Sequence, residues 1–422
     1  MKKLFLLAVL LMLLLLTAAQ AETARDITSD AAFHVPYIVD GTLRRMLDRS
    51  SETALQTGKQ KEPVLNVNMK TEAAAAVYIE FGTNILPFSV QIKEDGKWVD
   101  VASWDGPWAQ AYLEFPPQKE FRLRFETHNK YTALYVRELY LFSEGEMNDM
   151  PHVWQPPCEK ADLLLLVGHP DDELLWFGGL LPTYAGERGM KVQVAYLTCS
   201  NSMRREELLN GIWYCGVRNY PDIGEYEDIK SYSAVELYPM WGGRDKVDRY
   251  VVRLLRRYQP EVAVTQAIDG EYGHAAHVIC ARSMSRACLL ATDPDYDPES
   301  VAQYGVWTGK KVYLHKDNGV RVEISIQDES GEKVIIQRDD VPVTVMDWRV
   351  PLTFFGGLTG FEAAEKAYLL HMSQPHDKNG KKSLYYITPE NDENSSFVYT
   401  LIYSTVGDDE AGGDLFEHID GY

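Results

Sequence analysis

The chain has 422 residues, of which 45% are hydrophobic, and its formal net charge at pH 7 is −20. This length favours two or three domains, and the composition excludes wholesale disorder because the apolar residues suffice for real cores. The negative charge makes nucleic acid a poor candidate partner, since an acidic surface repels phosphate backbones and anionic membranes.

The first 21 residues have the pattern of a secretory signal peptide. Lys2 and Lys3 precede an apolar run from Leu4 to Leu16, and small residues follow at the expected cleavage site. The run is shorter than the roughly 20 apolar residues that span a bilayer. We therefore predict a cleaved signal peptide over residues 1–21, no membrane span in the mature chain, and a secreted or extracytoplasmic protein. The alternative is an uncleaved N-terminal anchor.

Residues 24–144 predict an all-β sandwich. Short runs rich in β-branched and aromatic residues alternate here with Gly, Asn, Asp and Pro, which is typical of strands joined by turns. The expected strands are Pro63–Met69, Ala75–Phe81, Phe88–Ile92, Ala111–Phe115, Phe121–Phe125 and Ala133–Phe142. Trp98, Trp104 and Trp108 would be loop residues that either stack on sugar rings or enter the core.

The order of these segments resembles a discoidin-type domain, the coagulation-factor C-type, galactose-binding-like sandwich. The resemblance rests on the successive stretches IVDGT, AVYIEFG, PFSVQIKEDGKWVDVAS, FRLRFE and ALYVRELYLF. It implies a module of a kind that is common among sugar-binding domains.

A different pattern follows a polar, aperiodic linker at residues 145–160. Continuous apolar runs predict strands buried on both faces of a parallel sheet, at Ala161–Gly168, Lys191–Thr198 and Pro260–Gln266. Amphipathic stretches predict helices at Leu174–Arg188, Met203–Cys215 and Arg244–Tyr258. Mixed β structure follows from Gly305, then a helix at Gly360–Met372 and a strand within Ser396–Gly407. The alternation indicates a layered α/β domain over residues 161–422.

The chemistry-bearing motif directly follows the first buried strand. Reactive groups gather at the carboxyl ends of such strands, and the sequence places His169-Pro170-Asp171-Asp172-Glu173 there. Because Pro170 stiffens the turn, His169 and Asp172 can be aimed at one point, where both are good zinc donors. A third ligand is expected from His274 or His277 after the third strand, with the other histidine addressing substrate. The alternative is an ordinary turn whose acids cap a helix.

These residues resemble the PIG-L (LmbE-like) zinc N-deacetylases. The similar stretches are LLLLVGHPDDELLWFGG, VQVAYLT, RREELLNGIWYCGV and DGEYGHAAHV, and the likeness spans about residues 161–374. The resemblance implies a Rossmann-like, mostly parallel sheet and a Zn²⁺ cofactor. It implies His169, Asp172 and His277 as metal ligands, Asp171 as general base, His274 as the residue that stabilises or protonates the reacting amide, and Arg204 as a substrate contact. Ala275 and Ala276 depart from the Pro-Asp of many members.

The predicted function is therefore that of an exported zinc-dependent hydrolase of linear amide bonds. It would remove acetyl groups from N-acetylglucosamine-type sugars or glycans, with water activated by the metal and Asp171 as base. Two alternatives stay open: a non-catalytic carbohydrate-binding protein, and an amidase acting on a thiol–sugar conjugate. Tyr272 either faces the substrate or packs, and His371 either lines the cleft or simply ends a helix.

Overall fold

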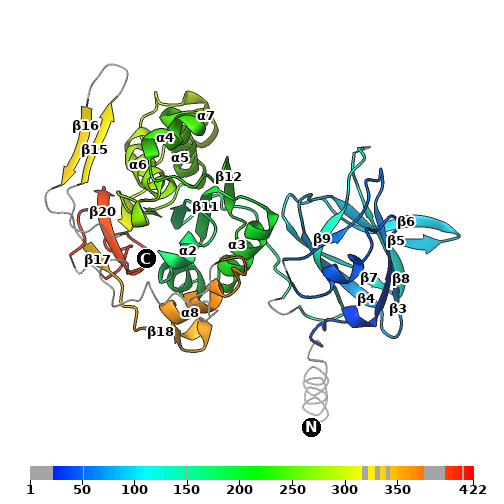
Figure 1. Cartoon of the computed structure of the whole chain (residues 1–422). Helices are drawn as coiled ribbons and strands as arrows, with labels where there is room; N and C mark the ends of the chain where they lie inside the picture. Colours follow the sequence, from blue (N-terminus) through cyan, green and yellow to red (C-terminus); the bar gives the residue numbers. More distant parts are fainter. Residues whose placement is uncertain are drawn as a thin grey trace, which may run out of the picture. The chain divides into compact units, whose positions relative to one another are not determined.

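The computed structural model divides the chain into two compact units, Met1–Val153 and Trp154–Tyr422 (Figure 1). It describes residues 22–50, 52–128, 130–147, 150–315, 322–327, 333–338, 343–374, 395–410 and 413–422. The predicted signal peptide at residues 1–21 lies outside the described residues. Among the described residues, none of the helices is long and apolar enough to cross a bilayer.

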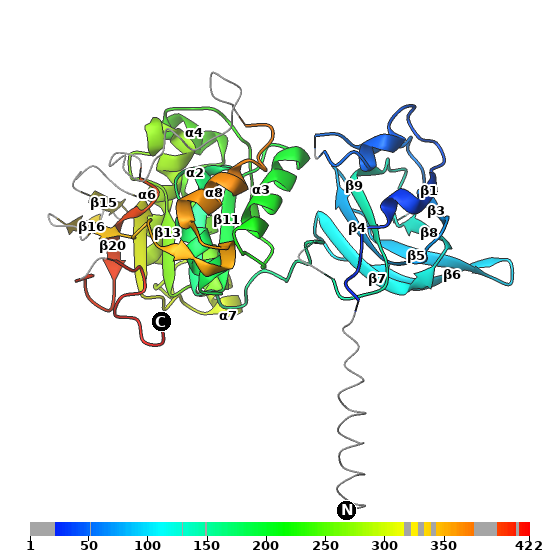
Figure 2. The same cartoon turned by 90° about the horizontal axis from the view of Figure 1, so that it is seen from below.

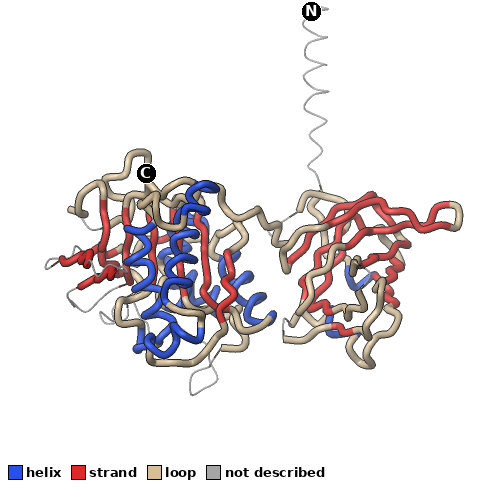
Figure 3. Tube along the Cα trace, turned by 90° about the horizontal axis from the view of Figure 1, so that it is seen from above, coloured by secondary structure: helices blue, strands red, loops and turns tan. Residues whose placement is uncertain are grey.

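The first unit is the predicted all-β sandwich, built from strands and loops with only short helical turns (Figure 3). One sheet has the order β1-β3-β8-β5-β6 and the other β2-β9-β4-β7, and every pairing is antiparallel. The strands are β1 Ala31–His34, β2 Leu55–Gln56, β3 Val64–Met69, β4 Ala74–Phe81, β5 Phe88–Glu94, β6 Lys97–Trp104, β7 Gln110–Gln118, β8 Glu120–Phe125 and β9 Tyr135–Phe142. Alternate residues of β3 and β8 point into a shared apolar core between the sheets.

Two of the tryptophans predicted for loops lie on strand β6 instead. Trp104 stacks against Phe81 and Phe88, with ring centroids 5.9 and 5.7 Å apart, and so belongs to the edge of the core. Trp98 is covered by the Arg122 guanidinium, 4.4 Å from its ring centroid. The loop prediction was wrong for both because Asp95-Gly96 forms a tight turn that pairs β5 with β6.

The boundary between the units, from Val153 to Trp154, falls close to the centre of the predicted linker. The Trp154 ring is buried and meets Trp213 and Tyr220 edge-on, at centroid distances of 5.0 and 5.5 Å. Gln155 then forms an isolated bridge with Asn219. The polar composition of residues 145–160 does not reveal that their second half packs onto the second unit.

The second unit contains a seven-stranded sheet of order β12-β11-β10-β13-β14-β20-β17. Its strands are β10 Leu163–Val167, β11 Val192–Thr198, β12 Asp222–Tyr226, β13 Val262–Thr265, β14 Lys311–His315, β17 Val343–Val345 and β20 Val398–Ser404. The five strands from β12 to β14 are parallel, and β20 is antiparallel to both of its neighbours. Because β10 pairs with β11 on one side and β13 on the other, the strand order reverses at β10. Ligands of such sheets bind at that reversal, beyond the carboxyl ends of the strands.

Helices cover both faces of this sheet (Figures 1 and 2). One side carries α4 Ala234–Met240, α5 Arg244–Tyr258, α6 Ala275–Leu290 and α7 Pro298–Tyr304, and the other carries α2 Asp172–Leu175, α3 Ser202–Tyr214 and α8 Gly360–Tyr368. The short pairs β15 Val322–Gln327 with β16 Lys333–Arg338, and β18 Pro351–Leu352 with β19 Leu358–Thr359, complete the unit. The fold is thus the expected mostly parallel α/β layered sheet.

The helix predicted at Leu174–Arg188 is broken. α2 ends at Leu175, and Pro182–Glu187 form a separate π-helix. The glycine pair between them allows close packing, because a Cβ on Gly179 would stand 2.1 Å from the Phe397 ring and one on Gly178 would stand 2.8 Å from Ala364. The amphipathic pattern therefore misled the prediction, since tertiary contact sets the backbone here.

Candidate active site

The predicted His-Pro-Asp-Asp turn leaves the carboxyl end of β10 and is held in an unusual conformation. Asp171 has a φ of 114°, a region that residues other than glycine rarely adopt. Its N–H donates to Oε2 of Glu173 at 2.9 Å, and its carbonyl accepts from Leu174 and Leu175. Such backbone strain persists only where the surroundings enforce it, and it concentrates at functional sites.

The two candidate histidines after β13 enter the same region from α6. His274 is the N-cap residue of α6, and His277 lies in the first turn of the helix. Their side chains are three residues apart and share one side of the helix. Both side chains are buried: His277 is fully buried, and His274 is 6% exposed.

Three atoms from these two segments converge. Nδ1 of His169 lies 3.2 Å from Oδ2 of Asp172 and 3.2 Å from Nε2 of His277, and the last two atoms are 3.1 Å apart. Tetrahedral zinc ligands at 2.0–2.1 Å from the metal stand about 3.3 Å from one another. The spacing therefore fits a single shared zinc ion. His274 belongs to a looser group, in which one atom each of His169, His274 and His277 lie within 4.8 Å.

Close packing under this triangle depends on Gly168. A Cβ there would stand 3.2 Å from the His277 ring and 3.3 Å from Oδ2 of Asp172. The Gly168 N–H donates to Oε1 of Gln266 at 3.0 Å, and the Trp176 indole donates to Oδ1 of Asp172 at 3.2 Å. The small size of Gly168 and the hydrogen bonds of Gly168 and Trp176 thus hold the residues around the triangle in place.

The electrostatic environment favours a cation between these residues. Burial alone would lower the pKa of His277, but the Asp172 and Glu271 carboxylates raise it to about 10. The pKa of Asp172 is held well below its usual range by His277 and His169, against the effect of burial. The imidazole nitrogens and the carboxylate that share a proton here are also the groups that a metal ion binds when it replaces that proton.

The pKa of His274 is shifted in the opposite direction to that of His277. Burial and the neighbouring His169 and His277 lower its pKa to about 4, so it is neutral at ordinary pH. Its Nδ1 has no hydrogen-bond partner among the described residues. The exposed rings of Tyr232 and Tyr272 flank it, with centroids 6.1 and 5.7 Å away. His274 can therefore meet a ligand that enters between two aromatic rings.

Asp171 and Arg204 contact each other rather than standing apart. Oδ1 of Asp171 lies 3.3 Å from Nη2 of Arg204, which also donates to the Pro170 carbonyl. Burial raises the pKa of Asp171 to about 7, although the Arg204 charge opposes the increase. Arg204 is predicted to contact substrate, and the structure places it on α3 against the turn, with a side chain that is 16% exposed.

Four buried residues lie behind the site, and the sequence interpretation named two of them, Glu173 and His371, but not Glu271 or His315. Glu173 lies 3.3 Å from His371, which is fully buried and stacks on Tyr368 rather than lining an open cleft. Glu271 contacts both His277 and His315. Glu271 stands three residues before His274, so its acidity beside that motif was a usable signal. His315 gave none, because only the sheet brings β14 beside β13.

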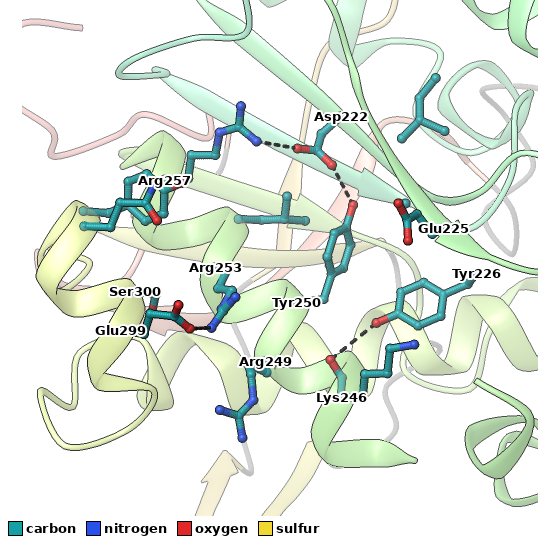
Figure 4. Close-up of a pocket in the computed structure, with 15 residues that line it drawn as sticks. Asp222, Glu225, Tyr226, Lys246, Arg249, Tyr250, Arg253, Arg257, Glu299 and Ser300 are labelled. Carbon is teal, nitrogen blue, oxygen red and sulfur yellow. Dashed lines mark hydrogen bonds and ion pairs between the residues drawn. The ribbon is translucent and has the colours of Figure 1, made fainter. Parts of the chain in front are cut away.

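A separate hollow of about 510 Å³ lies between β12, α5 and α7 (Figure 4). Arg249, Arg253 and Arg257 line it, and each faces a carboxylate. Arg253 and Arg249 approach Asp297 at 2.7 and 3.3 Å, and Arg257 approaches Asp222 at 3.3 Å. None of the predicted site residues lines this hollow.

Comparison with known proteins points to the same segment of the chain. Residues 164–288 match the family model described as "PIG-L: GlcNAc-PI de-N-acetylase". A 1D-myo-inositol 2-acetamido-2-deoxy-alpha-D-glucopyranoside deacetylase of Streptomyces scabiei is 27% identical over 331 residues, covering 65% of this chain and 96% of the relative. A like-named deacetylase 1 of Catenulispora acidiphila is 29% identical over 184 residues, covering 37% of this chain and 56% of its own length.

Among solved structures, similarity extends to an N,N'-diacetylchitobiose deacetylase from Pyrococcus horikoshii. It is 17% identical and covers 57% of this chain and 91% of its own, with a TM-score of 0.35. A family 32 carbohydrate-binding module of C. perfringens NanJ, in complex with galactose, is 14% identical and covers 28% of this chain and 99% of its own, with a TM-score of 0.24.

Proposed function

We propose that this chain, an amide hydrolase whose residues 164–288 form a PIG-L family domain, removes acetyl groups from N-acetylglucosamine-type sugars with the help of zinc. The observation that carries the proposal is the triangle of His169, Asp172 and His277 at the carboxyl ends of β10 and β13. Asp171 and His274 stand beside it, as a hydrolytic site requires.

His169, Asp172 and His277 would hold the metal. Two neutral imidazoles and one carboxylate form a three-ligand set that leaves a position for water or substrate, as catalytic zinc sites do. When bound, zinc polarises the amide carbonyl and makes water more acidic. Everything else in the reaction falls to side chains of the chain itself.

Asp171 is the residue placed to move a proton. It lies in the strained turn next to the ligand Asp172, and Arg204 fixes its carboxylate. In the proposed reaction it takes a proton from the attacking water and returns it to the leaving amine. His274, neutral and without a partner at Nδ1 among the described residues, donates a hydrogen bond to the amide oxygen as charge develops there.

The sugar class is supported by the surroundings of His274. Tyr232 and Tyr272 are each 63% exposed, and amphipathic aromatic rings of this kind suit the apolar faces of pyranose rings. The curated relatives are named as deacetylases of an acetamido sugar. We further propose that the chain is exported, on the signal-like N-terminus, and that the first unit binds the glycan, on the exposed rings of Tyr37 and Tyr131.

The test is acetate release by the purified chain loaded with zinc. N-acetylglucosamine, its β-linked disaccharide and its inositol conjugate are the substrates to compare. We expect acetate and free amine in equal amounts, loss of both on chelation, and recovery on adding zinc. Stoichiometric zinc with no acetate from any N-acetylated sugar would instead support a non-catalytic carbohydrate-binding protein.

A further inference from the structure

A chain of buried contacts continues behind His277, away from the metal-facing side of its ring. Oε2 of Glu271 lies 2.9 Å from Nδ1 of His277, and Oε1 lies 2.8 Å from Nδ1 of His315. Nε2 of His315 in turn lies 3.0 Å from the Ser395 carbonyl oxygen. Glu271 is 5% exposed and His315 is 2% exposed, so water cannot substitute for these contacts.

The chemistry of the partners decides which atoms donate. The Ser395 carbonyl can only accept, so His315 donates from Nε2. An ionised carboxylate can only accept as well, so His315 also donates from Nδ1 to Glu271. These two contacts connect the Glu271 carboxylate, through the His315 ring, to the main chain at Ser395.

His277 has the complementary arrangement. Its Nε2 faces Asp172 and His169, so a metal ligand must present the lone pair of that nitrogen and carry its proton on Nδ1. Neither Nδ1 of His277 nor Oε2 of Glu271 has a hydrogen-bond partner elsewhere among the described residues. Ala275 and Ala276, between the two histidines of α6, offer no polar side chain of their own.

The backbone is built to deliver Glu271 to this place. Gly270 has a φ of 71°, and a Cβ there would stand 2.8 Å from the His274 carbonyl oxygen. The Ala267 N–H donates to Oε1 of Glu271 at 3.1 Å, which closes the turn on the carboxylate. Apolar residues of similar volume often stabilise a core as much as a buried charged cluster does. Its position behind a candidate ligand therefore indicates a role at the site.

Building on the proposed function, we propose that Glu271 and His315 form a positioning pair for the metal ligand His277. Glu271 holds the Nδ1–H of His277, which fixes the ring so that Nε2 faces the metal. His315 contacts Glu271 and ties it to the main chain at Ser395. Groups that orient a ligand histidine in this way typically change metal affinity by about 10–100-fold when removed.

The experiment is a zinc titration of the metal-free full-length chain against a chromophoric chelator, with variants Glu271→Gln and His315→Gln. Each should bind zinc about 10–100-fold more weakly than the wild type. Both should also alter the visible absorption of the Co²⁺-loaded chain, which reports ligand geometry. Glu271→Asp, which keeps the charge on a shorter side chain, should recover part of the affinity.

The matched control is Asp222→Asn, which alters a partly buried carboxylate that accepts from Tyr250 and Tyr258 at the amino end of β12, whereas the histidines lie at the carboxyl ends of the strands. It should leave zinc affinity and the cobalt spectrum unchanged. Zinc affinity and cobalt spectra indistinguishable from wild type in Glu271→Gln and His315→Gln would overturn the proposal. Thermal unfolding shows whether each variant is folded. A single variant with the melting temperature of the Asp222→Asn control is sufficient, because its zinc affinity alone then supports or overturns the proposal. Failure of the proposed function would appear separately, as wild-type chain that binds zinc and releases no acetate.

Discussion

Replacing Asp171 with asparagine separates proton transfer from metal binding. Asparagine tolerates positive φ better than most residues, so it can keep the 114° of Asp171. Its amide oxygen can still accept from Arg204, which lies 3.3 Å from Oδ1 in the wild type. The backbone contact to Glu173 at 2.9 Å does not involve the side chain of residue 171. The variant therefore keeps the turn and loses only the basic oxygen.

The expected loss for Asp171→Asn is about 10²–10⁴-fold in kcat, the range for a missing general base. That range corresponds to about 3–5 kcal/mol of barrier height. The assay is steady-state acetate release from N-acetylglucosamine, with zinc per chain measured on the same preparation. Zinc content should stay at the wild-type value, and Asp222→Asn should keep both activity and zinc. Wild-type turnover in Asp171→Asn, or loss of zinc together with turnover, would refute this role.

Three further outcomes follow from packing and charge. Gly168→Ala should weaken zinc binding in a chelator competition, because the new Cβ would stand 3.2 Å from His277 and 3.3 Å from Asp172. Unchanged zinc affinity would mean that the turn shifts to accommodate the methyl group. Arg256→Ala should lower the free energy of unfolding in urea by about 3 kcal/mol or more, because this buried guanidinium donates to five main-chain carbonyls and one hydroxyl; a smaller change would show that water replaces those contacts. Burial raises the pKa of Glu138 from 4.5 to about 7, so the folded first unit binds this proton more tightly than the unfolded chain. Its stability should therefore fall between about pH 4.5 and pH 7, and thermal unfolding of Glu138→Gln should lack that fall.

The architecture could be predicted wherever burial leaves a continuous pattern. The strands β10, β11 and β13 are buried along their whole length because helices cover both faces of the sheet, and each was predicted from its mostly apolar run. Strand β12, with the sequence DIGEY, escaped prediction because it lies at the sheet edge and is only partly buried. The PIG-L resemblance is confirmed by the family match to residues 164–288.

The sequence predicted only those site residues that belong to short motifs. His169, Asp172 and His277 stand in two compact stretches, and the sheet brings both stretches to the same end, as the strand pattern predicted. Their roles, and those of Asp171, His274 and Arg204, remain predictions. Glu271 and His315 are 44 positions apart and become neighbours only through the pairing of β13 with β14. Spacing along the chain carries no sign of such a contact.

Metal analysis of the wild type and of Asp172→Ala, His277→Ala and Asp171→Ala tests the central claim most directly. The chain should retain one zinc after dialysis against a weak chelator, and Asp171→Ala should retain the same amount. Asp172→Ala and His277→Ala should retain almost none, since each removes one corner of the triangle. Equal zinc retention in all three variants, or a wild type that holds no zinc, would contradict the assignment.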